Sequence, residues 1–236
     1  MEIIIRKINV IKTVDQWYES APPEGGAKQW KHGRSAMEMA RLALSTRFEG
    51  IINGILEEVN GRDNTFICEP EALTYFANGM GSSGPRHHDL LMVGEETVIG
   101  IEAKVSESFD KRIKEKREKA GQNMNTRLDS CLHFMYGENL PDNAENLYYQ
   151  LFSATIGTIL EAQRKGKKRA IALFLTFVGN VCKEKDYEDK VSEKKLAFKE
   201  FCSTLGLDEN GGKISDVPGI ENEEIESWIL NVEITI

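Results

Sequence analysis

The feature that most constrains the fold is an apolar helix followed directly by an apolar strand. The segment NAENLYYQLFSATIGTILEAQRKG (143–166) has apolar side chains on nearly every face of a helix, so a largely buried helix is expected over 145–164. Gly166 is a suitable helix stop. RAIALFLTFVG (169–179) then forms an unbroken apolar run, which is typical of a central strand covered on both faces. Together they predict an α/β protein.

The remaining elements extend this α/β pattern. Three more strands of the same sheet are expected at 65–68, 89–93 and 97–104, with a hairpin turn at 94–96. Helices are expected at 13–29, with a break at APPEGG (21–26), and at 33–60 and 184–205, and a last strand at 227–236. Gly50 or Gly54 is expected to split the second helix. Residues 1–180 are predicted to form the principal domain, with 181–236 as a helix-strand extension packed on it.

The composition excludes several classes of protein. The chain has 236 residues and no apolar run of eighteen, so no transmembrane helix is expected. The first residues, MEIIIRKINVIKTVDQW, lack the uninterrupted apolar stretch and the cleavage site of a signal peptide. The four cysteines are widely scattered and form no C-x-x-C pair. We therefore expect no zinc site, reduced thiols and a cytoplasmic protein.

The net charge of −8 bears on the choice of partner. A protein that binds nucleic acid through its backbone usually presents basic side chains. Here they cluster only in DKRIKEKREKA (110–120) and RKGKKRA (164–170). Both runs are compatible with solvated helix ends or loops. Any nucleic acid would therefore have to meet one basic face of an acidic protein.

Two short motifs carry little functional information. GMGSSG (79–84) matches the spacing of a dinucleotide-binding loop, but that loop needs a strand before it and a helix after it. Here Pro85 and a strand follow, so a flexible linker is expected. His87 and His88 lack a third ligand at helical spacing. They are expected to lie where a loop enters a strand, although His88 could still assist a neighbouring site.

The stretch RHHDLLMVGEETVIGIEAK (86–104) places charged side chains inside two apolar strands. Alternation along a strand puts Glu102 and Lys104 on one face, and a hairpin could bring Asp89 across from them. Two neighbouring carboxylates suit Mg²⁺, a hard cation that takes one or two carboxylates and keeps several waters. Lys104 could then act on the attacking water or on charge developing at phosphate. The alternative is a surface ion pair, with Asp89 capping a turn.

The pattern Asp89…Glu102-Ala103-Lys104 resembles the signature of the PD-(D/E)XK nuclease superfamily. His88-Asp89 stands where the superfamily usually has Pro-Asp. The resemblance implies a restriction-endonuclease-like core of helix, three strands, helix and strand, with a central mixed sheet flanked by helices. WKHGRSAMEMA (30–40), TRLDSCLHFM (126–135) and YYQLFSATIGTILEA (148–162) also resemble an uncharacterised bacterial family of that superfamily, over roughly residues 10 to 180.

The resemblance brings further residues into the predicted site, each with an alternative. Glu38 matches a glutamate that reaches the metal, but Ser35-x-x-Glu38 is also a capping box. Gln150 matches a glutamine that contacts the site, or it lies on a partly exposed helix face. Glu107 matches an acidic position, or it belongs to a solvated loop. Arg127 either contacts phosphate or pairs with an acidic side chain.

The expected function is metal-dependent hydrolysis of nucleic-acid phosphodiester bonds. Asp89 and Glu102 would hold Mg²⁺ or Mn²⁺, Lys104 would assist the water, and Glu38 and Gln150 would support them. DNA is the favoured substrate, and a homodimer is compatible with the superfamily. Two alternatives stay open. One is a catalytically silent nuclease fold that binds or regulates, and the other is a hydrolase of small phosphate esters.

Overall fold

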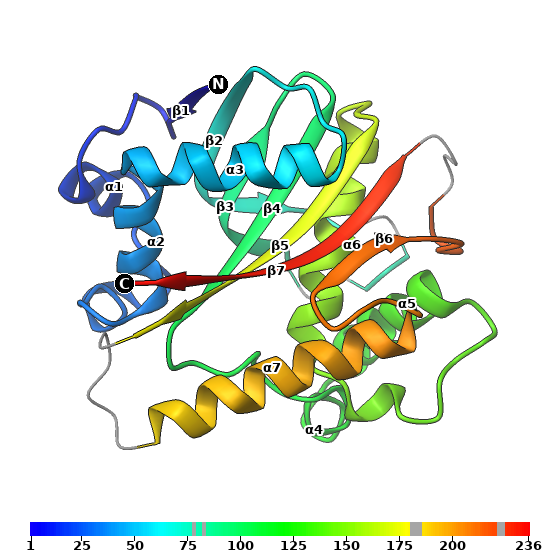
Figure 1. Ribbon diagram of the computed structural model, residues 1–236. Helices are drawn as coiled ribbons and strands as arrows, with labels where there is room; N and C mark the ends of the chain where they lie inside the picture. Colours follow the sequence, from blue (N-terminus) through cyan, green and yellow to red (C-terminus); the bar gives the residue numbers. More distant parts are fainter. Residues whose placement is uncertain (77–78, 82–83, 180–185, 221–224) are drawn as a thin grey trace.

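The computed structural model describes residues 1–76, 79–81, 84–179, 186–220 and 225–236. The protein has the predicted α/β fold, a seven-stranded mixed sheet flanked by helices (Figure 1). The strand order is β1-β2-β3-β4-β5-β7-β6. The part of the chain between these limits contains seven α-helices and two short 3₁₀ turns. Cys182 and residues 82–83 of the expected linker lie outside the described residues.

The strands expected from the sequence are present, and most extend beyond the predicted limits. The strands are β1 (Glu2–Ile5), β2 (Thr65–Thr74), β3 (Arg86–Val93), β4 (Thr97–Lys104), β5 (Arg169–Val178), β6 (Gly211–Ile214) and β7 (Glu226–Thr235). Neighbouring pairs β2–β3, β3–β4 and β6–β7 are antiparallel, whereas β1–β2, β4–β5 and β5–β7 are parallel. The expected hairpin between β3 and β4 is confirmed, and the Gly94 amide donates to the Thr97 carbonyl at 2.8 Å.

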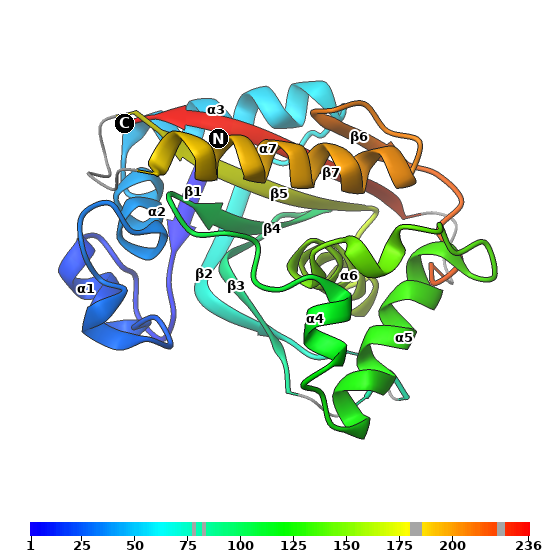
Figure 2. The same ribbon diagram turned by 90° about the horizontal axis from the view of Figure 1, so that it is seen from below.

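Helices cover both faces of this sheet (Figures 1 and 2). The helices are α1 (Val14–Ser20), α2 (Ser35–Ala43), α3 (Thr46–Glu58), α4 (Ile113–Arg117), α5 (Gln122–Tyr136), α6 (Tyr149–Arg164) and α7 (Tyr187–Thr204). α2 and α3 pack on one face, and α6 packs on the other with α5 beside it. The sheet is thereby the middle layer of three, as an unbroken apolar strand requires.

The two faces of the central strands belong to two separate cores. Along β4, Ile99, Ile101 and Ala103 point towards α2 and α3, whereas Val98 points towards α6. All eight residues of β4 are buried. Glu102 and Lys104 alternate with the first set and therefore lie on the α6 face, although they are charged. The fold thus places two charged side chains in a buried layer, beside other polar side chains such as His88 and Thr158.

The break in the predicted helix at 33–60 falls at a different place from the one expected. α2 ends at Ala43 and α3 begins at Thr46, whereas Gly50 and Gly54 lie inside α3. Ser45 has an extended backbone (φ −96°, ψ 154°), and its hydroxyl donates to the Leu42 carbonyl at 2.7 Å. Serine competes with helical hydrogen bonding in this way and favours helix starts, so the prediction of a glycine break was wrong.

Two further expectations concern membranes and thiols. None of the helices described is both long and apolar enough to span a membrane. Cys68, Cys131 and Cys202 are buried and free. Their burial raises the pKa of Cys131 and Cys202 to about 12, so these thiols are protonated at neutral pH and serve as core residues.

Candidate functional site

The site lies where β3 and β4 separate. The paired register of the hairpin ends at Leu90 and Ile101, and the next residues on the two strands are Asp89 and Glu102. Asp89 is half-buried, and its Oδ2 accepts a hydrogen bond of 2.6 Å from the backbone amide of Ala103. This side chain thus ties the end of β3 to β4 beyond the last paired residues.

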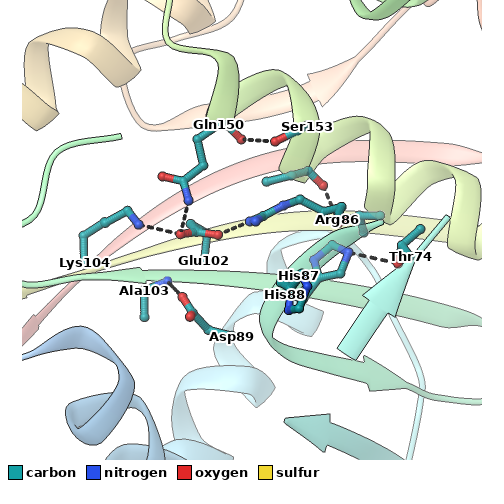
Figure 3. Close-up of polar contacts among 12 residues, drawn as sticks. Thr74, Arg86, His87, His88, Asp89, Glu102, Ala103, Lys104, Gln150 and Ser153 are labelled. Carbon is teal, nitrogen blue, oxygen red and sulfur yellow. Dashed lines mark hydrogen bonds and ion pairs between the residues drawn. The ribbon is translucent and has the colours of Figure 1, made fainter. Parts of the chain in front are cut away.

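Glu102 is the centre of a hydrogen-bonded network (Figure 3). Its Oε1 accepts from Lys104 Nζ at 2.5 Å and from Gln150 Nε2 at 2.7 Å. Its Oε2 accepts from the guanidinium of Arg86. Gln150 lies in the first turn of α6, so the network joins β3, β4 and α6. Figure 3 shows Asp89 approaching β4 from the side opposite to the Glu102 carboxylate.

These side chains line a pocket of about 400 Å³. Its walls come from the segment that precedes α2, from β2 to β4, from the segment after β4 and from the start of α6. The lining residues are Pro23, Glu24, Lys28, Gln29, Arg34, Ser35, Ala36, Glu71, Arg86, His87, Asp89, Glu102, Lys104, Glu107, Ser108, Asp110 and Gln150. Six are Asp or Glu and four are Lys or Arg, so acidic side chains outnumber basic ones in the lining.

The charges of Glu102 and Lys104 are fixed by each other and by Arg86. Burial alone would raise the pKa of Glu102, but Arg86 and Lys104 outweigh it and lower the pKa to about 2. Burial alone would lower the pKa of Lys104, but Glu102 and Asp89 raise it above its usual value. Glu102 is therefore ionised and Lys104 protonated across the physiological range.

The other two carboxyl groups of the site have raised pKa values. Burial and the charge of Glu102 raise the pKa of Asp89 to about 7, against the opposing effects of Lys104 and the Ala103 amide. Burial, Asp89 and Glu102 raise the pKa of Glu71 to about 8. Burial is the largest cause of both shifts, so neither carboxyl is fully ionised at neutral pH.

Glu71 was not predicted from the sequence. It lies in β2, between residues that pair with Leu90 and His88 of β3, so it stands at the level of Asp89. Its backbone has φ 47°, a conformation that is uncommon outside glycine. The strand was expected to end at Cys68, but β2 continues through Pro70 to Thr74. Pairing with β1 ends at Cys68, and a strand edge without a partner tolerates proline.

Arg86 was also missed, although it precedes His87 at the start of β3. Only 11% of its side chain is exposed, and it forms an ion pair with Glu102. Arg86 lies three residues before Asp89 in the sequence. This spacing alone does not predict a contact between Arg86 and the neighbouring strand.

The structure places two other predicted acidic residues differently. Glu38 is buried but is not among the described residues that line the pocket. Its Oε1 lies 2.8 Å from both the Gly33 amide and His32 Nδ1, and 3.0 Å from Arg41. Ser35 does not cap the helix in the expected capping box; its amide instead donates to Glu107 at 3.3 Å. Glu38 therefore fixes the entry into α2.

Glu107 does line the pocket. Its second oxygen accepts from the Val105 amide at 2.9 Å, so its carboxylate links the segment after β4 to the start of α2. These contacts do not agree with the alternative that Glu107 belongs to a solvated loop.

Arg127 and His88 are both buried. Arg127 donates to the carbonyls of Met80, Gly81 and Gly84 at 2.7, 2.6 and 3.1 Å, rather than to an acidic side chain. It organises the segment that leads to β3. Burial lowers the pKa of His88 to about 3, so it is neutral. Its Nε2 lies 3.1 Å from Thr74 Oγ1.

The donor set determines which metals the site could hold. The described residues contain no group of three or more His, Cys, Asp or Glu side chains arranged to hold a metal ion. Asp89, Glu102 and Glu71 offer oxygen atoms, and His87 is the single imidazole among the described residues that line the pocket, so the lining does not provide the set of thiolate and imidazole ligands of a structural zinc site. Mg²⁺ and Mn²⁺ need only one or two protein carboxylates, and Asp89 and Glu102 both line the pocket. The residues present therefore fit a hard divalent ion.

Comparison with known proteins places the chain in a family without assigning it an activity. No curated protein and no solved structure matches it. Residues 10–233 match the family described as a domain of unknown function, DUF6946. That match spans nearly all of the sheet and every helix described above, and the chain therefore belongs to the DUF6946 family.

Proposed function

We propose that this protein hydrolyses nucleic-acid phosphodiester bonds with the aid of Mg²⁺ or Mn²⁺. The observation that carries the proposal is that Asp89, Glu102, Lys104 and Gln150 all line one pocket, where two strands separate beside the helix that covers them. Chance pairing at a strand edge would leave such groups solvated, whereas Glu102 and Lys104 are only 4% and 8% exposed.

The order of elements supports a place in the PD-(D/E)XK nuclease superfamily. A helix precedes three consecutive antiparallel strands, and α6 then connects β4 to its parallel neighbour β5. The acidic pair comes from the second and third of those strands, as the resemblance implies. We infer that the family shares this superfamily's core and that β1, β6 and β7 extend the sheet.

Each side chain has a distinct role in this proposal. Asp89 and Glu102 would hold the divalent ion, which when bound supplies a Lewis acid and a water of lowered pKa. The Lys104 ammonium is held by Glu102 and would stabilise negative charge as it develops on phosphate oxygens. Gln150 holds Glu102 Oε1 in place, and Glu71, whose pKa is about 8, would lose its proton when a cation binds beside it.

The excess of carboxylates around the pocket favours a second candidate, a protein that keeps the fold but does not cleave. Without a bound cation this lining repels phosphate, and Glu102 is already paired with Arg86 and Lys104. In that case the pocket would bind a cation or a cationic ligand, and nucleic acid would not be a substrate.

Digestion assays distinguish the two candidates. Linear, supercoiled and single-stranded DNA, and RNA, should be incubated with the protein in Mg²⁺ or Mn²⁺ and in EDTA. The proposal expects metal-dependent cleavage that is lost in Asp89→Asn. Asp142→Asn, a change at an exposed loop position, is the matched control and should cleave like the wild type. Metal binding without cleavage of any substrate would favour the second candidate.

A further inference from the structure

Arg86 occupies a position in which its charge competes with a metal ion. Its guanidinium donates to Oε2 of Glu102, whereas Oε1 is taken by Lys104 and Gln150. Both oxygens of this carboxylate are thus already engaged. A divalent ion that binds Glu102 has to replace at least one of these donors.

Among these donors, Arg86 is the one that combines a positive charge with an incompletely paired side chain. Lys104 is two residues from Glu102 on the same strand, and Gln150 is uncharged and adds no repulsion towards a cation. Arg86 reaches across from β3, and its Nε is buried without a hydrogen-bond partner among the described residues. An arrangement that leaves a buried donor without a hydrogen-bond partner is less stable than one in which the donor is paired.

The side chain of Arg86 passes through a space that α6 leaves open. A Cβ atom at Gly157 would lie 3.3 Å from Arg86 Cγ and 3.3 Å from His88 Nε2, which is closer than most real contacts. The glycine therefore lets the aliphatic part of Arg86 lie between α6 and β3. The guanidinium at its end reaches the pocket, which Arg86 also lines.

We propose that Arg86 is an internal counter-ion that a divalent metal displaces from Glu102, and that the released guanidinium then binds a phosphate oxygen of the substrate. The inference rests on the proposed function. Before metal arrives, Arg86 neutralises Glu102 and keeps the carboxylate paired. Once displaced, its planar set of donors matches the geometry of phosphate. One residue would thus couple metal binding to substrate binding.

Calorimetry on wild type, Arg86→Gln and Arg86→Lys gives the first test. With Mn²⁺ alone, Arg86→Gln should bind roughly 10- to 100-fold more tightly than wild type, because a competing positive charge has gone. Arg86→Lys keeps the charge and should stay close to wild type. In saturating Mg²⁺, inorganic phosphate should bind Arg86→Gln at least about tenfold more weakly than wild type, because a guanidinium donor is missing.

The opposite signs of these two effects separate the proposal from a merely structural role. Mn²⁺ affinity that is unchanged or weaker in Arg86→Gln would overturn the displacement. Unchanged phosphate affinity would overturn the transfer to phosphate. If Mn²⁺ does not bind even the wild type, the metal site of the proposed function fails as well. If wild type binds Mn²⁺ and Arg86→Gln binds it equally, only the present inference fails.

A measurement on the wild type avoids dependence on the folding of a variant. The Nε–H signal of Arg86 in a ¹H–¹⁵N spectrum can be assigned by its absence from Arg86→Lys. It should shift during a Mg²⁺ titration with the same midpoint as binding measured by calorimetry. A signal that stays fixed while Mg²⁺ binds would contradict the displacement.

Discussion

Lys104 Nζ lies 2.5 Å from Glu102 Oε1, and both side chains are directed to the α6 face of one strand. In this arrangement Lys104 is a neighbour of the acidic pair and carries its positive charge into the pocket. Its predicted role is to stabilise charge on phosphate, not to hold the ion.

Lys104→Ala should therefore leave Mn²⁺ binding within a few-fold of wild type, whereas cleavage should fall about 10²–10³-fold, as for the loss of one positioned electrostatic donor. Calorimetry and digestion on the same preparations measure the two effects. Asp89→Asn is the comparison, since it should lose both. Cleavage by Lys104→Ala at the wild-type rate would show that the assignment of this lysine is wrong.

Asp89 should make the stability of the metal-free protein depend on pH. Its pKa is about 7 in the folded protein, above its ordinary value of 3.8, so the folded state holds a proton that the unfolded state releases. The contribution of this group to stability is full below the ordinary value and is lost as pH rises through about 4 to 7.

Asp89→Asn cannot ionise, so it should gain stability relative to wild type by about 2–3 kcal/mol between about pH 5 and pH 8. Urea denaturation in EDTA at both pH values measures the change, with Asp142→Asn as the control. Parallel behaviour of Asp89→Asn and wild type would contradict the raised pKa. Saturating Mg²⁺ should reverse the order at the higher pH, because only the wild type gains binding energy.

At Gly100, side chains of α6 and β3 lie very close to the backbone of β4. A Cβ there would lie 2.1 Å from Thr158 Oγ1 and 2.9 Å from His88 Nδ1. Gly100→Ala should therefore destabilise the protein by about 1–3 kcal/mol through overpacking. Thr158→Ala removes the nearer atom, and the double variant should recover part of the loss, with a coupling of at least about 0.5 kcal/mol. Additive effects in thermal denaturation would argue against this contact.

The resemblance and the structure imply different roles for Glu38. Its carboxylate accepts from Gly33 and contacts His32 and Arg41, so Glu38→Gln should lower stability by about 1–3 kcal/mol, as expected for a buried charged hydrogen-bond acceptor. Mn²⁺ affinity should stay within about twofold of wild type, since 1.4 kcal/mol would be needed for a tenfold change. A tenfold loss of affinity would instead return Glu38 to the metal site that the resemblance implies.

The central elements could be predicted because their signals are local. The run from Arg169 to Val178 is apolar throughout, and β4 was bounded correctly at Thr97 and Lys104 by its pattern and by the Gly94 turn. Other elements gave no such signal. β1 and β6 have four residues each and form through pairing with distant strands. α5 carries polar residues through its first turns, and only packing against α6 explains it.

The residues of the site also fall into two groups, those that the sequence pattern reveals and those that depend on tertiary structure. Glu102 and Lys104 are linked by strand alternation, which sequence spacing reveals, and Asp89 by its place in a hairpin. Arg86 and Glu71 depend on how β2, β3 and β4 lie against one another where they separate. The positive φ of Glu71 is a tertiary property, and no spacing in a single sequence encodes it.

The position of β7 has a consequence for synthesis of the protein. β7 lies between β5 and β6, and pairs with β5 along all ten of its residues. On the ribosome, β5 emerges before α7, β6 and β7, so its outer edge stays unpaired while those segments are translated, at about 5–20 residues per second. An apolar strand with a free edge is prone to join another chain. The nascent protein is thus exposed to aggregation, and to capture by chaperones, in the few seconds before β7 arrives to cover this edge.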